Sequence, residues 1–180
     1  ISYVSYEHYA FPKYLQKLTG VTVKNMGAGG KTTKEWYDMN VNTPLTGYDC
    51  AIIQLGVNDL IRESTLEETK TYLTNIINKL KTENTGIKIF VSTIIPATSY
   101  SNAGYIAISE AIREVVATIT SDVYLVDLAV YGHTKDEVAY NNGHLSAYGY
   151  WQLAKDYKAY ISYIIANNKL AFRNIQFAGT

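Results

Sequence analysis

The fold is decided by the stretch Cys50-Ala51-Ile52-Ile53-Gln54-Leu55-Gly56-Val57-Asn58-Asp59. It opens with a mostly apolar run that contains β-branched side chains, which is typical of a strand buried in a sheet. Similar runs occupy residues 21–24, 87–95 and 123–128, and the segments between them are long enough for helices. Because strands alternate with helices, we predict an α/β fold, a three-layer sandwich built around a parallel sheet.

The clearest helix is expected after Ser64, because Ser64-x-x-Glu67 and Thr65-x-x-Glu68 are overlapping capping boxes. Further helices are expected over residues 5–18, over residues 104–120, and from residue 146 to beyond residue 164. The helix after Ser64 carries an apolar stripe at helical spacing, formed by Leu66, Leu73, Ile76, Ile77 and Leu80.

Composition favours one domain spanning residues 1–180, since 180 residues with 47% hydrophobic content suffice for a single sizeable core. The 16 basic and 16 acidic residues are mixed without runs, so neither a nucleic-acid partner nor a membrane surface is expected. The single cysteine, Cys50, allows no internal disulfide and is expected to act as a small buried hydrophobe.

The C-terminal residues 170–180 alternate in a way that is typical of an extra strand. Such a strand could pack on an edge of the sheet, lead into a neighbouring domain, or take the place of a strand missing from the start of the sheet. The pattern leaves these three alternatives open.

Tyrosine is unusually frequent, with 17 residues against 4 phenylalanines. A tyrosine side chain joins a flat apolar ring to a hydrogen-bonding hydroxyl, which suits wet recognition surfaces such as those that bind sugars. Alternatively, most of these tyrosines simply replace phenylalanine on half-buried faces.

Three short motifs carry the candidate chemistry, and each follows a predicted strand or precedes a predicted helix. They are Asn25-Met26-Gly27-Ala28-Gly29-Gly30-Lys31-Thr32-Thr33, Gly56-Val57-Asn58-Asp59, and Asn141-Asn142-Gly143-His144-Leu145-Ser146-Ala147-Tyr148-Gly149-Tyr150. In order and placement they resemble three of the four blocks of the SGNH (GDSL) hydrolase family. The resemblance implies a flavodoxin-like fold and a serine esterase that needs no metal and no cofactor.

The resemblance also implies roles for individual residues. Gly30 and Asn58 would donate hydrogen bonds to the oxyanion, and His144 would be the base that takes the proton of a serine. Asn25 would fix its loop, and Asp59 would anchor the loop that contains it. We further expect a substrate-binding role for Gly29, Tyr140 and Tyr148.

Two departures from the family pattern concern the catalytic groups. The family places an aspartate three residues before the histidine, where this chain has Asn141, which can accept a hydrogen bond but carries no charge. The fourth block, a strand that ends in Gly-Asp-Ser, is missing, so the nucleophile is unassigned. Ser2 and Ser5 lack the strand and glycine turn that would expose a nucleophile, and Asp127 and Asp136 are conceivable substitutes for the aspartate.

Two other interpretations compete with an esterase. Gly30-Lys31-Thr32 after a strand could belong to a phosphate-binding P-loop, but that motif requires glycine where this chain has Asn25. The chain could also be a catalytically silent carbohydrate-binding module in a secreted or phage-tail adhesion protein. We expect a small-molecule or carbohydrate ester as substrate, within a larger multidomain protein or virion, and a secreted or virion-associated location rather than a cytoplasmic one.

Overall fold

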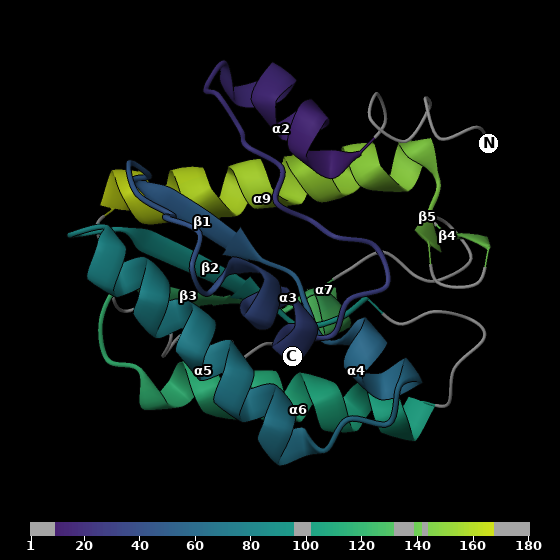
Figure 1. Ribbon diagram of the computed structural model, residues 1–180. Helices are drawn as coiled ribbons and strands as arrows, with labels where there is room; N and C mark the ends of the chain where they lie inside the picture. The colour runs from purple at the N-terminus through teal and green to yellow at the C-terminus, as the bar shows by residue number, and fades with distance from the viewer. Residues whose placement is uncertain (1–9, 96–101, 132–138, 142–143, 168–180) are drawn as a thin grey trace, which may run out of the picture.

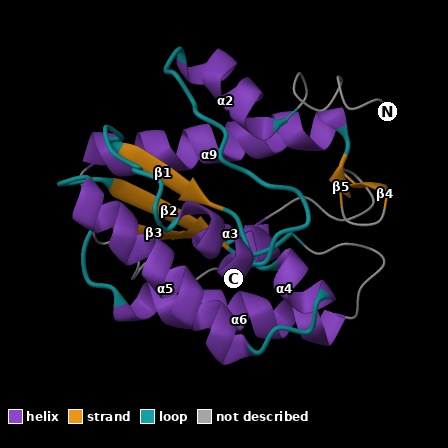
Figure 2. Cartoon of the chain, viewed as in Figure 1, coloured by secondary structure: helices purple, strands orange, loops and turns teal. Residues whose placement is uncertain are grey.

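The computed structural model describes residues 10–95, 102–131, 139–141 and 144–167. These residues form a three-layer α/β/α sandwich, with a parallel sheet between two helical layers (Figure 1, Figure 2). In chain order the elements are α2 (Phe11–Thr19), α3 (Thr33–Asn40), β1 (Cys50–Ile53), α4 (Val57–Ile61), α5 (Leu66–Glu83), β2 (Lys88–Ser92), α6 (Asn102–Thr118), β3 (Val123–Val126), α7 (Leu128–Tyr131), β4 (Ala139–Asn141), β5 (His144–Leu145) and α9 (Ala147–Asn167).

The described strands of the main sheet run in the order β1-β2-β3 and are all parallel, as predicted. Strand β2 lies in the middle and is buried on both faces. Ile89 and Val91 belong to the core under α5 and α6, and Phe90 belongs to the core under α9. This alternation follows from the two-residue period of a strand.

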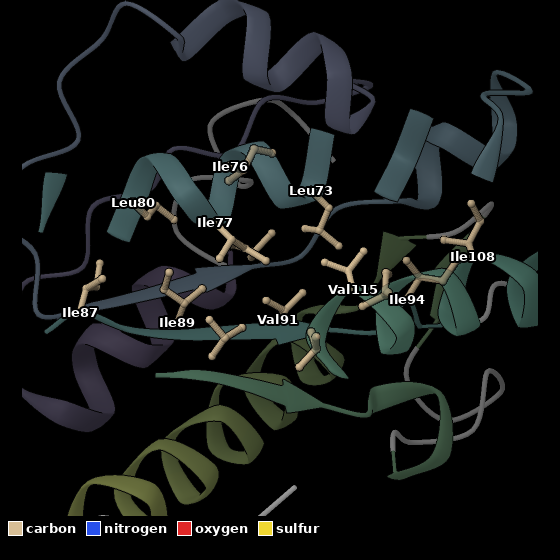
Figure 3. Packing of buried hydrophobic residues seen from close by; sticks show 14 of the residues in the cluster. Leu73, Ile76, Ile77, Leu80, Ile87, Ile89, Val91, Ile94, Ile108 and Val115 are labelled. Atoms are coloured by element: carbon tan, nitrogen blue, oxygen red, sulfur yellow. The ribbon is translucent and has the colours of Figure 1, made fainter. Parts of the chain in front are cut away.

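Two hydrophobic cores hold the layers together, one on each face of the sheet. Figure 3 shows the first, where α5 and α6 pack on β2. Leu73, Ile76, Ile77 and Leu80 of the predicted stripe are all buried there, and each such side chain contributes about 1.5–3 kcal/mol when removed from water. Leu66, the first residue of the predicted stripe, is 40% exposed because it lies at the start of α5, beyond the sheet.

The predicted helix bounds hold to within about two residues, except that α2 begins at Phe11 and not at residue 5. Of the two candidate N-caps, the structure uses Thr65, whose hydroxyl accepts a hydrogen bond from the N–H of Glu68 at 3.1 Å. Helix α2 has Pro12 in its first turn and ends at Gly20, whose φ is 74°. Helix α9 begins after Ser146, whose hydroxyl accepts from the N–H of Gly149 at 3.0 Å.

The predicted strand over residues 21–24 is wrong, since no strand forms there. Val21 is 58% exposed, and the N–H of Val23 donates to the side chain of Gln16 at 3.2 Å instead of to a neighbouring strand. A β-branched run stays in a sheet only where a second strand satisfies its backbone groups. Among the described residues the free edge of β1 has no such neighbour.

The expected strand at the C-terminal end is untested. Residues 170–180 lie outside the described part of the chain, so an additional strand there stays a prediction.

In the described residues, no helix combines the length and the apolar character that crossing a membrane requires.

The arrangement of the layers determines where a site can form. In Figure 1 the arrows of β1, β2 and β3 point toward the side of the molecule that carries α4 and the hairpin of β4 and β5. Open parallel sheets bind ligands beyond the carboxyl ends of their strands. The candidate motifs therefore lie on the side of the sheet where a site is expected.

Substitution of Gly56 tests the turn that leads from β1 into α4. Gly56 has a φ of 120°, and a Cβ atom there would lie 3.0 Å from Ile108 and 3.3 Å from Ile94. We expect Gly56→Ala to lower the free energy of unfolding by about 2–4 kcal/mol, from backbone strain and overpacking together. Urea denaturation measures this change.

The matched control is Gly47→Ala, because Gly47 also has a positive φ, of 85°, but an added Cβ would meet nothing within 4 Å. Gly47→Ala therefore reports strain at a positive φ without overpacking, and the loss at Gly56 should exceed it. Equal destabilisation of both would contradict the close approach of α6 to Gly56.

Candidate active site

The turn that precedes α3 exposes the backbone of Gly30. Helix α3 begins after Thr32 because Thr32 and Glu35 form a reciprocal capping box, with bonds of 3.1 and 3.2 Å. Gly30 has a φ of 72°, which favours glycine. Its N–H has no hydrogen-bond partner in the described part of the chain and is therefore available to a ligand.

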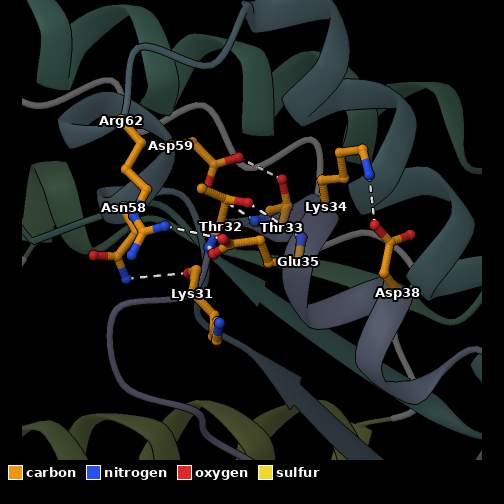
Figure 4. Close-up of polar contacts among 9 residues, drawn as sticks. All are labelled: Lys31, Thr32, Thr33, Lys34, Glu35, Asp38, Asn58, Asp59 and Arg62. Atoms are coloured by element: carbon orange, nitrogen blue, oxygen red, sulfur yellow. Dashed lines mark hydrogen bonds and ion pairs between the residues drawn. The ribbon is translucent and has the colours of Figure 1, made fainter.

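Asn58 lies directly beside this turn, as Figure 4 shows. Its side-chain Nδ2 donates a hydrogen bond of 3.1 Å to the carbonyl oxygen of Lys31. An amide nitrogen carries two N–H groups, and the second has no acceptor among the described residues. The structure thus brings together the two predicted oxyanion donors, Gly30 and Asn58, although their function as donors stays a prediction.

Asp59 anchors the same turn to α4 and α5. Its carboxylate is fully buried and accepts hydrogen bonds from the N–H of Thr33 at 3.0 Å, from the hydroxyl of Thr33, and from the hydroxyl of Thr69 at 3.1 Å. This confirms the expected structural role of Asp59. The expected role of Asn25 is confirmed too, because its Oδ1 accepts from the N–H of Gly27 at 2.9 Å.

His144 lies on β5, in the two-stranded hairpin that precedes α9. It is exposed, and its backbone pairs with that of Asn141 across the hairpin. Figure 1 places this hairpin on the side toward which the strands of the main sheet point. The role of His144 as the base, and that of Asn141 as its partner, stay predictions, and the side chain of Asn141 lies outside the described part of the structure.

The predicted substrate-binding residues differ in what the structure describes. Tyr148 is 58% exposed near the start of α9, and Gly29 is exposed in the turn before α3. The side chain of Tyr140 is outside the described portion. By contrast, Tyr124 and Tyr157 are buried, so these two tyrosines take the place that phenylalanine often has in a core.

Asp127 is committed to other contacts and does not serve as a substitute for the missing aspartate. Its carboxylate accepts from Nε and Nη2 of Arg113 at 2.8 and 2.7 Å and from the hydroxyl of Thr93 at 3.0 Å. This bidentate ion pair connects α6 to the carboxyl end of β3. Asp136 lies outside the described residues.

The structure does not identify the nucleophile among the described serines. Ser92 and Ser109 are buried, and Ser146 caps α9. Ser2 and Ser5 lie outside the described ranges. The nucleophile therefore remains unassigned.

Cys50 is a poor nucleophile because of its surroundings. It is partly buried and packs against the core under α9. Burial, with a smaller contribution from Asp49, raises the pKa of its thiol from the usual 9.0 to about 11. The thiolate is the reactive form, so at pH 8 the native protein should react with 5,5′-dithiobis(2-nitrobenzoate) about a hundredfold more slowly than the urea-unfolded chain.

The pH dependence provides a second test. The rate at which the native protein reacts with 5,5′-dithiobis(2-nitrobenzoate) should rise about tenfold for each pH unit up to the pKa of Cys50. Cys50 is the only thiol in the chain, so no second cysteine complicates the measurement. Equal native and unfolded rates at pH 8 would contradict the raised pKa.

Sequence reasoning missed two residues of this site, Glu35 and Arg62. Arg62 ends α4, and its Nη1 donates to Oε1 of Glu35 at 2.9 Å. The pattern Thr32-x-x-Glu35 is itself a capping box. It could have identified Glu35 as the residue that orders the turn, whereas nothing in the sequence pairs Glu35 with Arg62.

Comparison with known proteins identifies the family of the chain. The model of the GDSL-like lipase/acylhydrolase family matches residues 4–152. None of the curated proteins compared with the chain matches it.

Solved structures share the fold. A G-D-S-L family protein from Desulfitobacterium hafniense has a TM-score of 0.72 at 16% identity, over 84% of this chain and 88% of that one. A family 3 carbohydrate esterase from Talaromyces cellulolyticus has a TM-score of 0.68 at 24% identity, over 83% and 75%. A family 3 carbohydrate esterase from Clostridium thermocellum has a TM-score of 0.66 at 22% identity, over 88% and 87%. Because the family match spans most of the sequence, the chain belongs to the GDSL-like lipase/acylhydrolase family of ester hydrolases.

Proposed function

We propose that this protein is a serine-type esterase that removes small acyl groups, above all O-acetyl groups, from carbohydrate. One observation carries the proposal: the hydrogen bond from Asn58 to the carbonyl of Lys31 holds a side-chain amide next to the exposed N–H of Gly30. Two neighbouring N–H donors form the arrangement that stabilises a negatively charged oxygen.

The chemistry assigns one step to each group. A serine oxygen attacks the acyl carbon while His144 takes the serine proton, and the carbonyl oxygen becomes negative between Gly30 and Asn58. The carbon–oxygen bond to the sugar then breaks, and His144 returns the proton to the departing hydroxyl. Water, activated by the same histidine, releases the acyl group as a free acid. Each oxyanion donor contributes about 3–4 kcal/mol to the stabilisation of the transition state.

Two observations support carbohydrate as the carrier of the ester. Carbohydrate esterases are among the proteins of known structure that share this fold. Tyr148 exposes its ring at the beginning of α9, four positions after His144, and an exposed aromatic ring suits contact with a sugar.

A catalytically silent carbohydrate-binding module is the second candidate, and one feature of the sequence favours it. Asn141 stands where the resemblance expects an aspartate, so no charge at that position would stabilise a protonated His144. A binding module would keep an affinity for sugar without turnover.

Acetate release from acetylated xylan, measured beside hydrolysis of p-nitrophenyl acetate, separates the two candidates. We expect many turnovers per protein molecule on both substrates. Binding to acetylated xylan without acetate release would overturn the esterase and support the binding module.

Labelling with a fluorophosphonate probe identifies the nucleophile. Such a probe modifies an activated serine, and peptide mapping then locates the modified residue. We expect one serine to be labelled, and we expect the labelling to slow when His144 is replaced. Labelling that is absent, or that spreads equally over many serines, would contradict a serine mechanism.

A further inference from the structure

The ion pair between Arg62 and Glu35 connects the end of α4, the helix that carries Asn58, to the start of α3, which follows Gly30. Glu35 lies in the first turn of α3, and Arg62 lies at the end of α4. The two residues are 27 positions apart in the sequence, and Nη1 of Arg62 donates to Oε1 of Glu35 at 2.9 Å. Figure 4 shows Arg62 reaching from α4 toward the turn before α3.

The carboxylate of Glu35 serves both sides of this connection. Its Oε2 accepts from the N–H of Thr32 at 3.2 Å, while its Oε1 accepts from Arg62. One carboxylate thus orders the backbone immediately after Gly30 and joins it to α4. Arg62 also lies over Gly30, since a Cβ atom built on Gly30 would be 3.8 Å from Nη2 of Arg62.

Stability does not explain this pair. The side chains of Arg62 and Glu35 are 50% and 34% exposed, and ion pairs at such positions contribute about 0–1 kcal/mol to folding. Asp59, which is buried and accepts from Thr33 and Thr69, already anchors the turn. The pair adds a constraint on the position of α4 relative to the start of α3 rather than a large share of the folding energy.

We propose that Arg62 and Glu35 are positioning residues that set the distance between the N–H of Gly30 and the amide of Asn58. The inference rests on the proposed function, because it concerns the oxyanion site. Asn58 itself also contacts the turn, through its hydrogen bond to the carbonyl oxygen of Lys31. The contact of Arg62 with Glu35 does not involve Asn58, so it holds α4 against the turn independently while the second N–H of the Asn58 amide donates to a substrate.

Kinetic constants distinguish positioning from binding. A misplacement of about 1 Å can cost up to a hundredfold in rate, and these variants remove one of three contacts that join α4 to the turn before α3. We expect Arg62→Gln and Glu35→Gln each to lower kcat for p-nitrophenyl acetate about tenfold, with KM changed less than twofold. Glutamine at position 35 still suits a capping box, so this variant removes the ion pair and keeps the start of α3.

A double variant and a matched control complete the kinetic arm. Because both single variants break one contact, Arg62→Gln/Glu35→Gln should be no slower than either. The control is Lys34→Gln, which removes an exposed ion pair on the same helix, that of Lys34 with Asp38 at 2.5 Å. We expect the control to keep the kcat of the unmodified protein.

A measurement without substrate separates failure of this inference from failure of the proposed function. The amide resonance of Gly30 in a 1H–15N correlation spectrum should shift in Arg62→Gln and Glu35→Gln and stay in place in Lys34→Gln. An inactive unmodified protein would refute the proposed function, and the spectrum would then decide the positioning role alone. An unshifted Gly30 amide, or a kcat equal to that of Lys34→Gln, would overturn the inference.

Discussion

His144→Gln is expected to lower kcat for p-nitrophenyl acetate about a thousandfold. A positioned general base contributes roughly 10²–10⁴-fold to the rate, and glutamine keeps the hydrogen-bonding capacity of histidine without its ability to take up a proton. His144 is exposed on β5, in a short hairpin before α9. The loss should therefore fall on kcat and leave the free energy of unfolding nearly unchanged.

The control for this substitution is His133→Gln, which replaces a histidine that belongs to none of the three motifs. Initial rates of p-nitrophenol release, with urea denaturation of each variant, make the comparison. If His144→Gln turned over substrate as fast as His133→Gln, the histidine would have no part in the reaction.

Asn58→Asp should reduce kcat by a similar factor, through a different cause. Removal of one oxyanion donor costs about 10²–10³-fold, and the aspartate would add a negative charge where the oxygen becomes negative. Its carboxylate would also face the carbonyl of Lys31, to which Asn58 now donates at 3.1 Å. We expect a loss of about a thousandfold, at the upper end of that range.

Asn78→Asp is the matched control because it makes the same change of charge at an exposed position on α5. The kinetics of both variants on p-nitrophenyl acetate should be measured at low and high salt, since a charge at an exposed site is screened. A kcat for Asn58→Asp within about threefold of the control would remove Asn58 from the list of donors, because one donor is worth far more.

Local patterns in the sequence predicted most of the fold. The apolar run at Cys50–Ile53 and the stripe on α5 became β1 and the main helical contact with the sheet. The glycine after α2 and the hydroxyl of Ser146 before α9 ended and began their helices as expected. These features depend on residues within one or two turns of each other, so the sequence contains all the information that they need.

Where the prediction failed, the outcome depended on distant residues. Residues 21–24 have the composition of a strand, but the described edge of β1 offers them no partner. Asp127 follows its strand as a candidate for the missing aspartate, yet Arg113 of α6 takes both of its carboxylate oxygens. The sequence around residues 21–24 and around Asp127 does not show which distant residues these segments meet.

The candidate site divides in the same way. The sequence by itself determined which groups could act: a glycine in a turn, an amide after a strand, and a histidine before a helix. Only the tertiary structure decided that Asn58 meets the carbonyl of Lys31, that Asp59 anchors Thr33, and that Arg62 reaches Glu35. The physical reason is that a side chain's type sets which bonds it can form, while its partner is chosen by the packing of β1, α3 and α4 around a shared core.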